Sequence, residues 1–351
     1  MTTENTAFLK MAIQNKDMRI AVVGAGAIGG LVAGYLKLKG HEVQLVGRAG
    51  AVSAIKEKGL RISGVRGDFD LKLDILEKLE STPELAILAV KTQDLEAALV
   101  DNIAYLNDAL VITAQNGVRA DDIACRLLPK ENVISSIVMF GATSLEPGEV
   151  VHNFEGNWII GRVSGNNDNR VFSASEVLNS AFPAVVTEGI RGMKYLKVFV
   201  NANNCIPALL GISMQEAFSD IRISRIAVEV WREGFEVISK AGLELLSLPD
   251  FPLERLKGMV SKPAEEAAGI YTGIMLNLSK EPLYGSILQS IRRGKPSEID
   301  YINGEFVRIA GENQLQAPLN EKLVTLVHGV EKGSGFLKKE ELLERVKEFL
   351  G

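Results

Sequence analysis

The chain has 351 residues, of which 46% are hydrophobic and 24% are charged. At about 150 residues per domain this length predicts two domains, and the composition excludes a disordered polyelectrolyte or a fibre. The net charge of -5, without a block of five or six basic residues, argues against nucleic acid as the main partner. Two cysteines and three histidines, all far apart in the chain, predict neither a disulfide framework nor a metal site.

Residues 1–17 precede the first apolar run and are expected to form a polar N-terminal extension that is partly disordered. This segment lacks the basic start and apolar stretch of a signal peptide or membrane anchor. No apolar run in the chain reaches the roughly 18 residues that a membrane-spanning helix needs. We therefore expect a cytoplasmic protein without a membrane partner.

Residues 18–186 alternate between strand and helix patterns. The segment RIAVVGAGAIGGLVAGYLKLKGHEVQLVGR, from residue 19, reads as a complete βαβ unit, and the apolar runs at 85–91 and 109–117 are each followed by a helical pattern. Continuous apolar strands separated by helices predict a Rossmann-type, doubly wound and mostly parallel sheet. The glycine-punctuated segment GEVVHNFEGNWIIGR, after residue 147, predicts short antiparallel strands at its edge.

Residues 187–351 show almost no strand signal. Apolar residues recur there at three-and-four spacing in KYLKVFVNANNCIPALLG, ISRIAVEVWREGFEVISKAG and EIDYINGEFVRIAGEN, and the tail KKEELLERVKEFL reads as a further amphipathic helix. The second domain is therefore expected to be all-helical.

The run GAGAIG at 24–29 lies between the first strand and the first helix, where it predicts a dinucleotide-binding turn. Gly24 permits the tight turn, Gly26 lets a pyrophosphate approach the backbone, and Gly29 allows close packing of helix and strand. Ile28 is the fourth candidate, in the first turn of a helix whose N-terminus faces the anion. The alternative is a glycine-rich turn that binds nothing.

Arg48 follows the second strand, where NAD-dependent enzymes usually have an acidic residue for the ribose hydroxyls. A guanidinium can instead form a charge-assisted fork with a 2′-phosphate. We therefore expect NADP(H) as cofactor, with a solvated loop arginine as the alternative.

Lys91 and Asn116 lie at the carboxyl ends of the next two predicted parallel strands. Ligands bind at this edge of doubly wound sheets, so both residues are cofactor-binding candidates, and Asn116 is also a substrate-binding candidate. An ordinary strand-end cation and an Asn-Gly turn are the respective alternatives.

Over residues 18 to about 335 the chain resembles the ketopantoate reductases (2-dehydropantoate 2-reductases). The resemblance rests on GAGAIG with Arg48, AVKTQD at 89–94, QNG at 115–117, Lys197 with Asn201, and SILQSIRRGKPSEIDYING at 286–304. It implies that Lys197 is the general acid and that Glu298 helps to hold the substrate and the lysine. It also implies that Asn116, Asn201 and Ser286 line the substrate site.

These roles are chemically reasonable. Hydride reduction of a ketone leaves an alkoxide that needs a proton, and a lysine ammonium can supply one. Lys197 and Asn201 are four residues apart and share one helix face. Lys194, one turn earlier, is the competing candidate for the general acid, but no asparagine follows it four residues on. The alternatives are a solvated helix lysine, and for Glu298 an acidic helix N-terminus with Ser297 as cap.

Two positions depart from the family pattern. Cys205 stands where a second asparagine is common, one helical turn beyond Asn201 and directly after Asn203 and Asn204, and Leu283 stands where a substrate-binding asparagine is frequent. A small buried hydrophobe is the favoured interpretation of Cys205 over a reactive thiol.

The leading hypothesis is therefore NADPH-dependent reduction of a branched 2-oxoacid, with ketopantoate reduced to pantoate for pantothenate biosynthesis as the first candidate. Reduction of a different 2-oxoacid or an imine, and an NADP(H)-binding sensor without catalysis, are the alternatives. We expect the substrate between the two domains, and the apolar faces of the helical domain would suit a homodimer.

Overall fold

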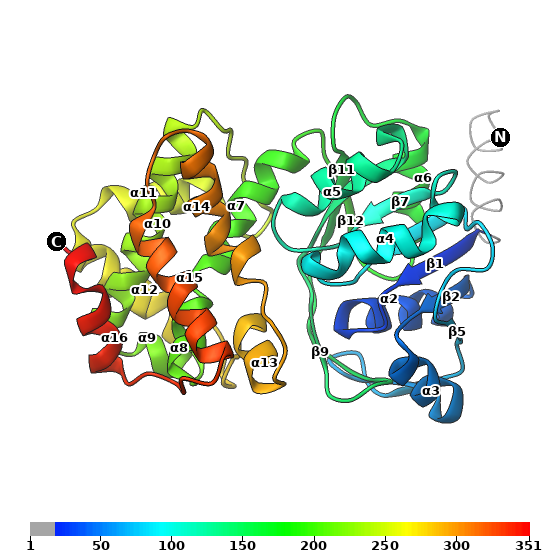
Figure 1. The fold of residues 1–351 in the computed structure, drawn as a ribbon, viewed down its shortest axis with the longest axis horizontal. Helices are drawn as coiled ribbons and strands as arrows, with labels where there is room; N and C mark the ends of the chain where they lie inside the picture. Colours follow the sequence, from blue (N-terminus) through cyan, green and yellow to red (C-terminus); the bar gives the residue numbers. More distant parts are fainter. Residues whose placement is uncertain (1–17) are drawn as a thin grey trace, which may run out of the picture. The chain divides into compact units, whose positions relative to one another are not determined.

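The structure, a computed structural model, describes residues 18–351, so the expectation for residues 1–17 lies outside the described residues. The chain divides into two compact units between Arg191 and Gly192. The part before this boundary is called unit 1 and the part after it unit 2. Figure 1 shows a sheet with helices in unit 1 and helices throughout unit 2.

The main sheet of unit 1 has eight strands in the order β12-β11-β8-β7-β6-β1-β2-β5. Neighbouring strands are parallel except β8 and β11, which are antiparallel. The strands are β1 (Arg19–Val23), β2 (Glu42–Val46), β5 (Asp74–Leu76), β6 (Leu85–Leu88), β7 (Leu110–Thr113), β8 (Val133–Val138), β11 (Trp158–Arg162) and β12 (Ala184–Val186). The predicted Rossmann-type sheet is thereby confirmed.

Helices cover both faces of this sheet. Ile20 and Val22 of β1 belong to one hydrophobic core, with residues of α2 and α6, whereas Ala21 and Val23 belong to the opposite core, with residues of α4 and α5. Two covered faces explain why β1 is apolar without alternation. The helices are α2 (Ala27–Leu38), α3 (Ala49–Lys58), α4 (Thr92–Leu106), α5 (Arg119–Leu127), the short η2 (Lys130–Asn132) and α6 (Asn169–Asn179).

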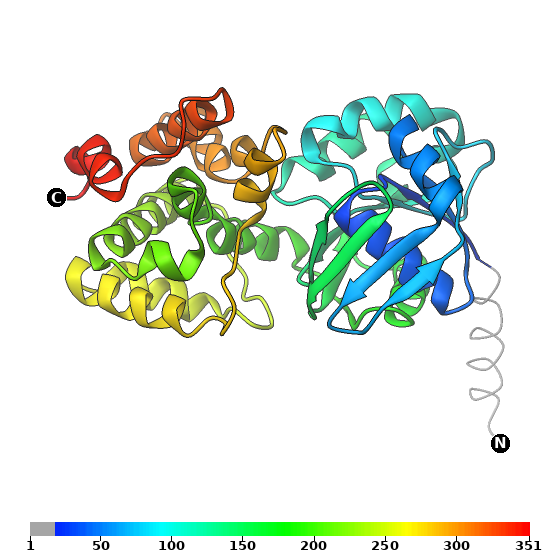
Figure 2. The same ribbon diagram turned by 90° about the horizontal axis from the view of Figure 1, so that it is seen from below.

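A second sheet of four strands packs on α2, in the order β4-β3-β10-β9. Its strands are β3 (Leu60–Gly64), β4 (Phe69–Leu71), β9 (Gly141–Ser144) and β10 (Glu149–Phe154), and Figure 2 shows them side by side. The segment predicted as antiparallel edge strands is therefore divided, because β11 joins the main sheet and β10 the second sheet. In β10 the buried residues Val150 and His152 alternate with more exposed ones, which is typical of a strand with one covered face.

Unit 2 contains no extended strand among residues 192–351, in agreement with the predicted helical domain. Its long helix α10 packs against α11, α12, α14 and α15, and the ring of Phe199 contacts that of Phe306 at 4.8 Å between centroids. The helices are α7 (Ile190–Ala202), α8 (Cys205–Leu210), α9 (Met214–Phe218), α10 (Ile221–Lys240), α11 (Leu253–Ser261), α12 (Ala264–Leu276), α13 (Ser286–Arg292), η3 (Ile299–Tyr301), α14 (Asn303–Glu312), α15 (Pro318–Glu331), α16 (Lys339–Val346) and η4 (Lys347–Phe349).

Within residues 18–351, no helix combines the length and the apolar character that crossing a membrane requires. In the same part of the chain, no three or more His, Cys, Asp or Glu side chains are grouped so that they could hold a metal ion.

Candidate functional site

The cofactor-binding candidates of unit 1 follow four adjacent parallel strands. In the sheet order β7-β6-β1-β2, the strand ends lead to Asn116, Lys91, Gly24 and Arg48 respectively. Backbone hydrogen bonds still join the neighbouring segments at this edge, from Gly24 N to Val46 O (2.8 Å) and from Ala89 N to Val23 O (2.7 Å). The chain leaves β1 toward β2 and returns to β6 on its other side, so the glycine run lies at the topological switch point.

The glycine run has the shape of a phosphate cradle. Gly24 has φ +119°, and a Cβ there would lie 2.6 Å from Val90 N, while a Cβ on Gly29 would overlap the carbonyl oxygen of Gly24. A Cβ on Gly26, in contrast, would meet no atom within 4 Å. Helix α2 begins directly after Gly26 without a side-chain cap or an acidic residue in its first turn, which contains Ile28. The residues present therefore fit a dinucleotide pyrophosphate at a helix N-terminus.

Arg48 forms an ion pair that sequence reasoning missed. It precedes α3 with a side chain that is 82% exposed, and its Nη2 lies 2.8 Å from Oδ1 of Asp94 in the first turn of α4. Asp94 is the last residue of the AVKTQD segment, but 46 positions separate it from Arg48 in the sequence. A carboxylate thus lies beside the arginine proposed to bind a 2′-phosphate.

Lys91 and Asn116 are both half-buried at the same sheet edge. Lys91 precedes the first residue of α4, and Asn116 O accepts a hydrogen bond from Thr92 Oγ1 at 3.4 Å. Their neighbour Gln115 was not predicted: its Nε2 donates to Leu88 O (2.8 Å) and Val90 O (3.0 Å), while its buried Oε1 has no partner. A bound N–H or O–H donor would satisfy this buried acceptor.

Lys197 and Asn201 lie one turn apart on α7, and both are half-buried. Lys197 is therefore not a solvated helix lysine. Burial, followed by the positive charge of Lys194, lowers the pKa of Lys197 from 10.5 to about 8. Lys194 itself is only 2% exposed. A lysine whose pKa is close to neutral pH is well suited to donate a proton.

The interpretation that places Cys205 one turn beyond Asn201 on the same helix is wrong. Helix α7 ends at Ala202, a turn follows, and Cys205 begins α8. The reason is Pro207, which lacks the N–H that a continuous helix would bond to the carbonyl of residue 203, and whose ring would clash with that carbonyl. Cys205 is fully buried, and burial is the main cause that raises the pKa of its thiol to about 12, as expected for a small buried hydrophobe.

Ser286 is the exposed first residue of α13. Leu283, which departs from the family pattern, is held by two backbone hydrogen bonds. Its carbonyl oxygen accepts from Met214 N (2.9 Å), and its N–H donates to Gln215 Oε1 (3.0 Å). Asn204 lies beside the residue that precedes Ser286, since a Cβ on Gly285 would be 3.2 Å from Asn204 Cβ. Asn204 therefore lies beside Gly285, directly before α13, which the sequence did not indicate.

Glu298 is half-buried and directly precedes η3. Its side chain makes no capping hydrogen bond, whereas the hydroxyl of Ser297 accepts from Ile299 N at 3.3 Å. The serine thus takes the capping role, and the carboxylate of Glu298 does not.

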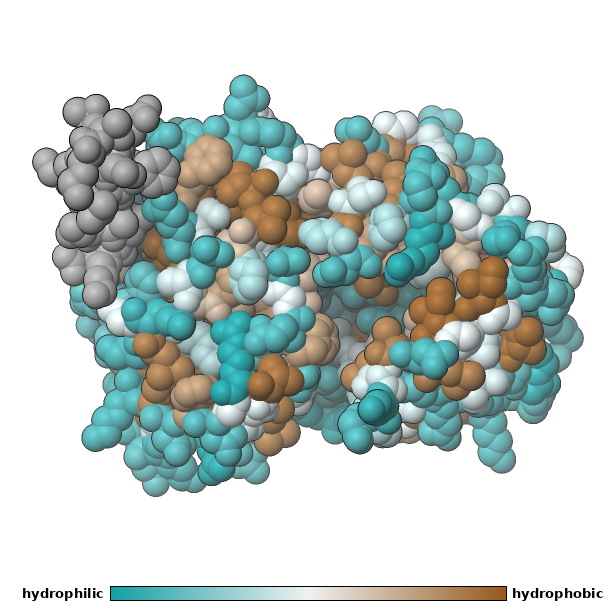
Figure 3. Space-filling view, turned by 180° about the vertical axis from the view of Figure 1, so that it is seen from behind, coloured by the Kyte–Doolittle hydropathy of each residue, from teal (hydrophilic) through white to brown (hydrophobic). Residues whose placement is uncertain are grey.

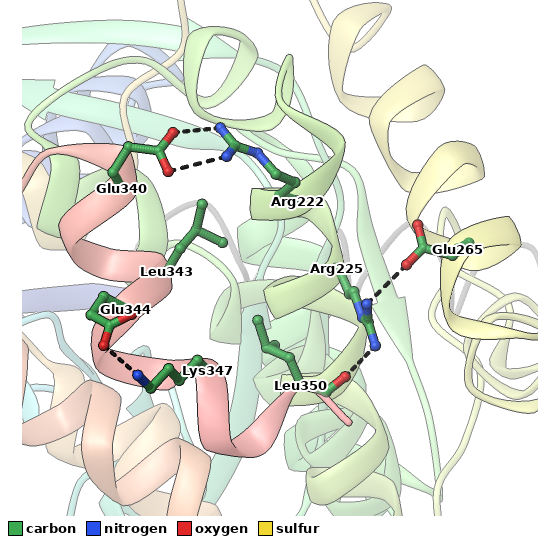
Figure 4. A pocket seen from close by; sticks show the side chains of 8 residues that line it. All are labelled: Arg222, Arg225, Glu265, Glu340, Leu343, Glu344, Lys347 and Leu350. Atoms are coloured by element: carbon green, nitrogen blue, oxygen red, sulfur yellow. Dashed lines mark hydrogen bonds and ion pairs between the residues drawn. The ribbon is translucent and has the colours of Figure 1, made fainter.

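A separate hollow of unit 2, drawn in Figure 4, lies between α10, α12 and the C-terminal segment. Its three cations are paired with carboxylates: Arg222 with Glu340 at 2.7 Å, Arg225 with Glu265 at 2.9 Å, and Lys347 with Glu344. Arg225 also donates to Leu350 O. These contacts attach the end of the chain to α10 and α12, and they give the hollow no unneutralised charge for a ligand.

The fold and the glycine cradle define a dinucleotide-dependent oxidoreductase with a helical second unit. Comparison with known proteins narrows this class: the family model "Ketopantoate reductase PanE/ApbA" matches residues 20–165, and its C-terminal counterpart matches residues 189–331. The chain belongs to the ketopantoate reductase family, which confirms the resemblance noted in the sequence.

Individual relatives agree with this assignment. The 2-dehydropantoate 2-reductase of Pyrococcus abyssi (strain GE5 / Orsay) is 32% identical over 90% of this chain and 98% of its own length, and that of Archaeoglobus fulgidus is 30% identical over the same shares. Among solved structures, a PanE/ApbA family ketopantoate reductase from Ralstonia eutropha JMP134 has a TM-score of 0.76 at 26% identity, covering 90% of this chain and 99% of that one. D-mandelate dehydrogenase in complex with NADH and anilino(oxo)acetate has a TM-score of 0.77 at 26% identity, with the same coverage.

Proposed function

We propose that this protein uses NADPH to reduce a branched 2-oxoacid, and that ketopantoate is its substrate and pantoate its product, as in pantothenate biosynthesis. The observation that carries the proposal is Lys197, whose pKa of about 8 keeps it charged at neutral pH and able to release a proton. The name of the relatives, 2-dehydropantoate 2-reductase, supports the same substrate.

The cofactor, when bound, supplies the hydride. The chain's own contribution is a proton from Lys197 Nζ to the oxygen of the reduced carbonyl. Glu298, Asn201, Ser286 and Asn116 are proposed to bind and orient the substrate. In this proposal residues 18–186 form the NADP-binding domain and residues 187–351 the helical substrate and catalytic domain.

The choice of NADP(H) rests on Arg48, with Gly24, Gly26, Ile28, Gly29, Lys91 and Asn116 as the other cofactor-binding residues. The guanidinium is exposed and can leave Asp94 for a 2′-phosphate, to which it forms a stronger, doubly charged pair. Asp94 competes for the guanidinium, and the D-mandelate dehydrogenase structures contain NADH. Parallel measurement with NADPH and NADH therefore belongs to the first test.

A second 2-oxoacid is the alternative substrate, because the solved D-mandelate dehydrogenase is as similar in structure as the solved ketopantoate reductase. The buried thiol of Cys205 and the apolar Leu283 also stand where family members commonly carry amides. An aromatic 2-oxoacid would gain more from an apolar side chain than the hydroxylated ketopantoate would.

Oxidation of NADPH by the purified protein, followed at 340 nm with a panel of 2-oxoacids, tests the proposal. The panel contains ketopantoate, phenylglyoxylate, which is the 2-oxo form of mandelate, and an unbranched 2-oxoacid. We expect the highest kcat/KM for ketopantoate. A higher value for phenylglyoxylate would establish the alternative, and no turnover of any 2-oxoacid would refute both.

We also propose a homodimer formed through unit 2 and a cytoplasmic location. Helix α12 exposes Ile270, Ile274 and Leu276, and Figure 3 shows hydrophobic surface on this unit. Exposed apolar patches commonly mark protein interfaces. Sedimentation equilibrium of the wild type and of Ile274→Lys tests the dimer: a dimeric wild type and a monomeric variant are expected, and a monomeric wild type would contradict it. Free Cys125 and Cys205 are compatible with a reducing compartment.

A further inference from the structure

His328 of α15 lies between two carboxylates. Its Nδ1 is 2.8 Å from Glu331 Oε2, and its Nε2 is 3.0 Å from Asp300 Oδ1. Ionised carboxylates only accept hydrogen bonds, so both ring nitrogens must donate to make both contacts. Only the imidazolium carries a proton on each nitrogen. The arrangement therefore selects the charged form of His328.

The same two carboxylates hold the chain on either side of Glu298. Glu331 uses its other oxygen, Oε1, to accept the backbone N–H of Ser297 at 2.7 Å, one residue before Glu298. Asp300 belongs to η3 and lies two residues after Glu298. His328 thus connects two anchors, and through them α15 fixes the backbone that carries Glu298.

The protonation of His328 reflects these partners. Burial lowers the pKa of the imidazole, but the hydrogen bonds to Glu331 and Asp300 outweigh burial, so the net direction is upward from 6.5. For Glu331, burial raises the pKa, but the hydrogen bonds from Ser297 and His328 lower it by more. The net direction is downward from 4.5, so the carboxylate remains ionised. Both shifts favour the pair of imidazolium and carboxylate.

The elements that pack on α15 carry other titratable groups with partners of their own. Helix α8 has Cys205 as its titratable residue, and α14 carries Glu305, Arg308 and Glu312, which are paired with one another. Glu233 of α10 binds the backbone N–H groups at residues 319 and 320, near the opposite end of α15. The charged groups that contact the imidazole are Asp300 from η3 and Glu331 from α15 itself.

We propose that His328 is a positioning residue for Glu298, which it serves by clamping Ser297 through Glu331 and η3 through Asp300. This inference rests on the proposed function, in which Glu298 holds the substrate. Loss of the imidazolium proton leaves one carboxylate facing a nitrogen lone pair, so one of the two anchors is released. Substrate capture should then weaken as the pH rises through the pKa of His328.

A double-mutant cycle tests the proposal. His328→Gln, Glu298→Gln and the double variant are compared with wild type for kcat and for KM of the 2-oxoacid, at saturating NADPH and pH 6.5. His41→Gln is the matched control, because His41 also donates or accepts one side-chain hydrogen bond, to Ser180, but lies at the amino end of β2. Glu331→Gln, which is isosteric, provides a second break in the clamp should His328→Gln fail to fold.

We expect His328→Gln to raise KM for the 2-oxoacid about fivefold to tenfold, the size typical of a lost charge-assisted hydrogen bond, while KM for NADPH stays within twofold. The double variant should be no worse than Glu298→Gln, because a positioning residue acts through its target. The rise in KM of the wild type with pH should be absent from His328→Gln, and His41→Gln should behave as wild type.

Two outcomes would overturn the inference while leaving the proposed function intact: wild-type kinetics of both clamp variants, or a double variant whose loss equals the product of the single losses. Wild-type kinetics of Glu298→Gln would instead show that Glu298 does not bind the substrate. The proposed role of Glu298 would then be wrong, and His328 would have no substrate-binding residue to position. Comparison of these variants therefore distinguishes the two failures.

Discussion

Burial of the charged Lys197 lowers the free energy of unfolding, and this cost can be measured. The difference between a pKa of 10.5 in the unfolded chain and about 8 in the folded one corresponds to about 3 kcal/mol, at 1.36 kcal/mol per tenfold change in proton affinity. The unfolded chain binds the proton more tightly. The cost is therefore fully present below pH 8, decreases between pH 8 and 10.5, and is absent above that range.

Replacement of Lys197 by methionine removes the buried charge and retains a similar volume. We expect the free energy of unfolding at pH 7 to rise by about 1–3 kcal/mol, and Tm by several degrees, at roughly 2–4 °C per kcal/mol for a unit of this size. The turnover number should fall by about two to four orders of magnitude, the typical contribution of general acid catalysis. A variant that is more stable and nearly inactive is thus the expected result.

The pH profile and a matched variant complete this test. The wild-type kcat for 2-oxoacid reduction should fall as the pH rises through about 8, where Lys197 loses its proton. Lys194→Met should move this limb to higher pH, because the charge of Lys194 is one cause of the lowered pKa of Lys197. The reasoning is refuted by a Lys197→Met protein that melts below wild type, or by Lys194→Met being the less active of the two.

Three further predictions concern unit 1. Arg48→Ala should raise KM for NADPH at least tenfold and leave KM for NADH nearly unchanged. Asp94→Asn frees the guanidinium and should lower KM for NADPH. Equal effects of Arg48→Ala on both cofactors would contradict the assignment of Arg48 to a 2′-phosphate. Gly26→Val should preserve Tm, because a Cβ there has open space, and should abolish cofactor binding measured by fluorescence; unimpaired binding would exclude the cradle. His152 has a pKa that is lowered mainly by burial. The fold should therefore lose stability as the pH falls below about 6.5, because the unfolded chain takes up the proton first. Thermal denaturation should show a smaller decrease of Tm with falling pH for His152→Gln than for wild type.

Local patterns in the sequence were sufficient for the class of fold and for much of the candidate site. The turn at 24–29 is recognisable because its glycines, the apolar strand before it and the helical periodicity after it are all neighbours in the chain. Lys197 and Asn201 share a helix face for the same reason, since a spacing of four residues is one helical turn. The helical second unit likewise follows from periodicity alone.

Tertiary structure decided what distant segments do to one another. In the second sheet β3 pairs with β10, although more than 80 residues separate them in the sequence. Neither strand has a local pattern that indicates its partner. Arg48 meets Asp94, and His328 meets Asp300, only because separate elements end side by side. Even the pKa of Lys197 depends first on burial by packed neighbours, and only second on Lys194 of its own helix. Burial, charge pairing and strand partnership arise from contacts distant in sequence, and periodicity carries no information about them.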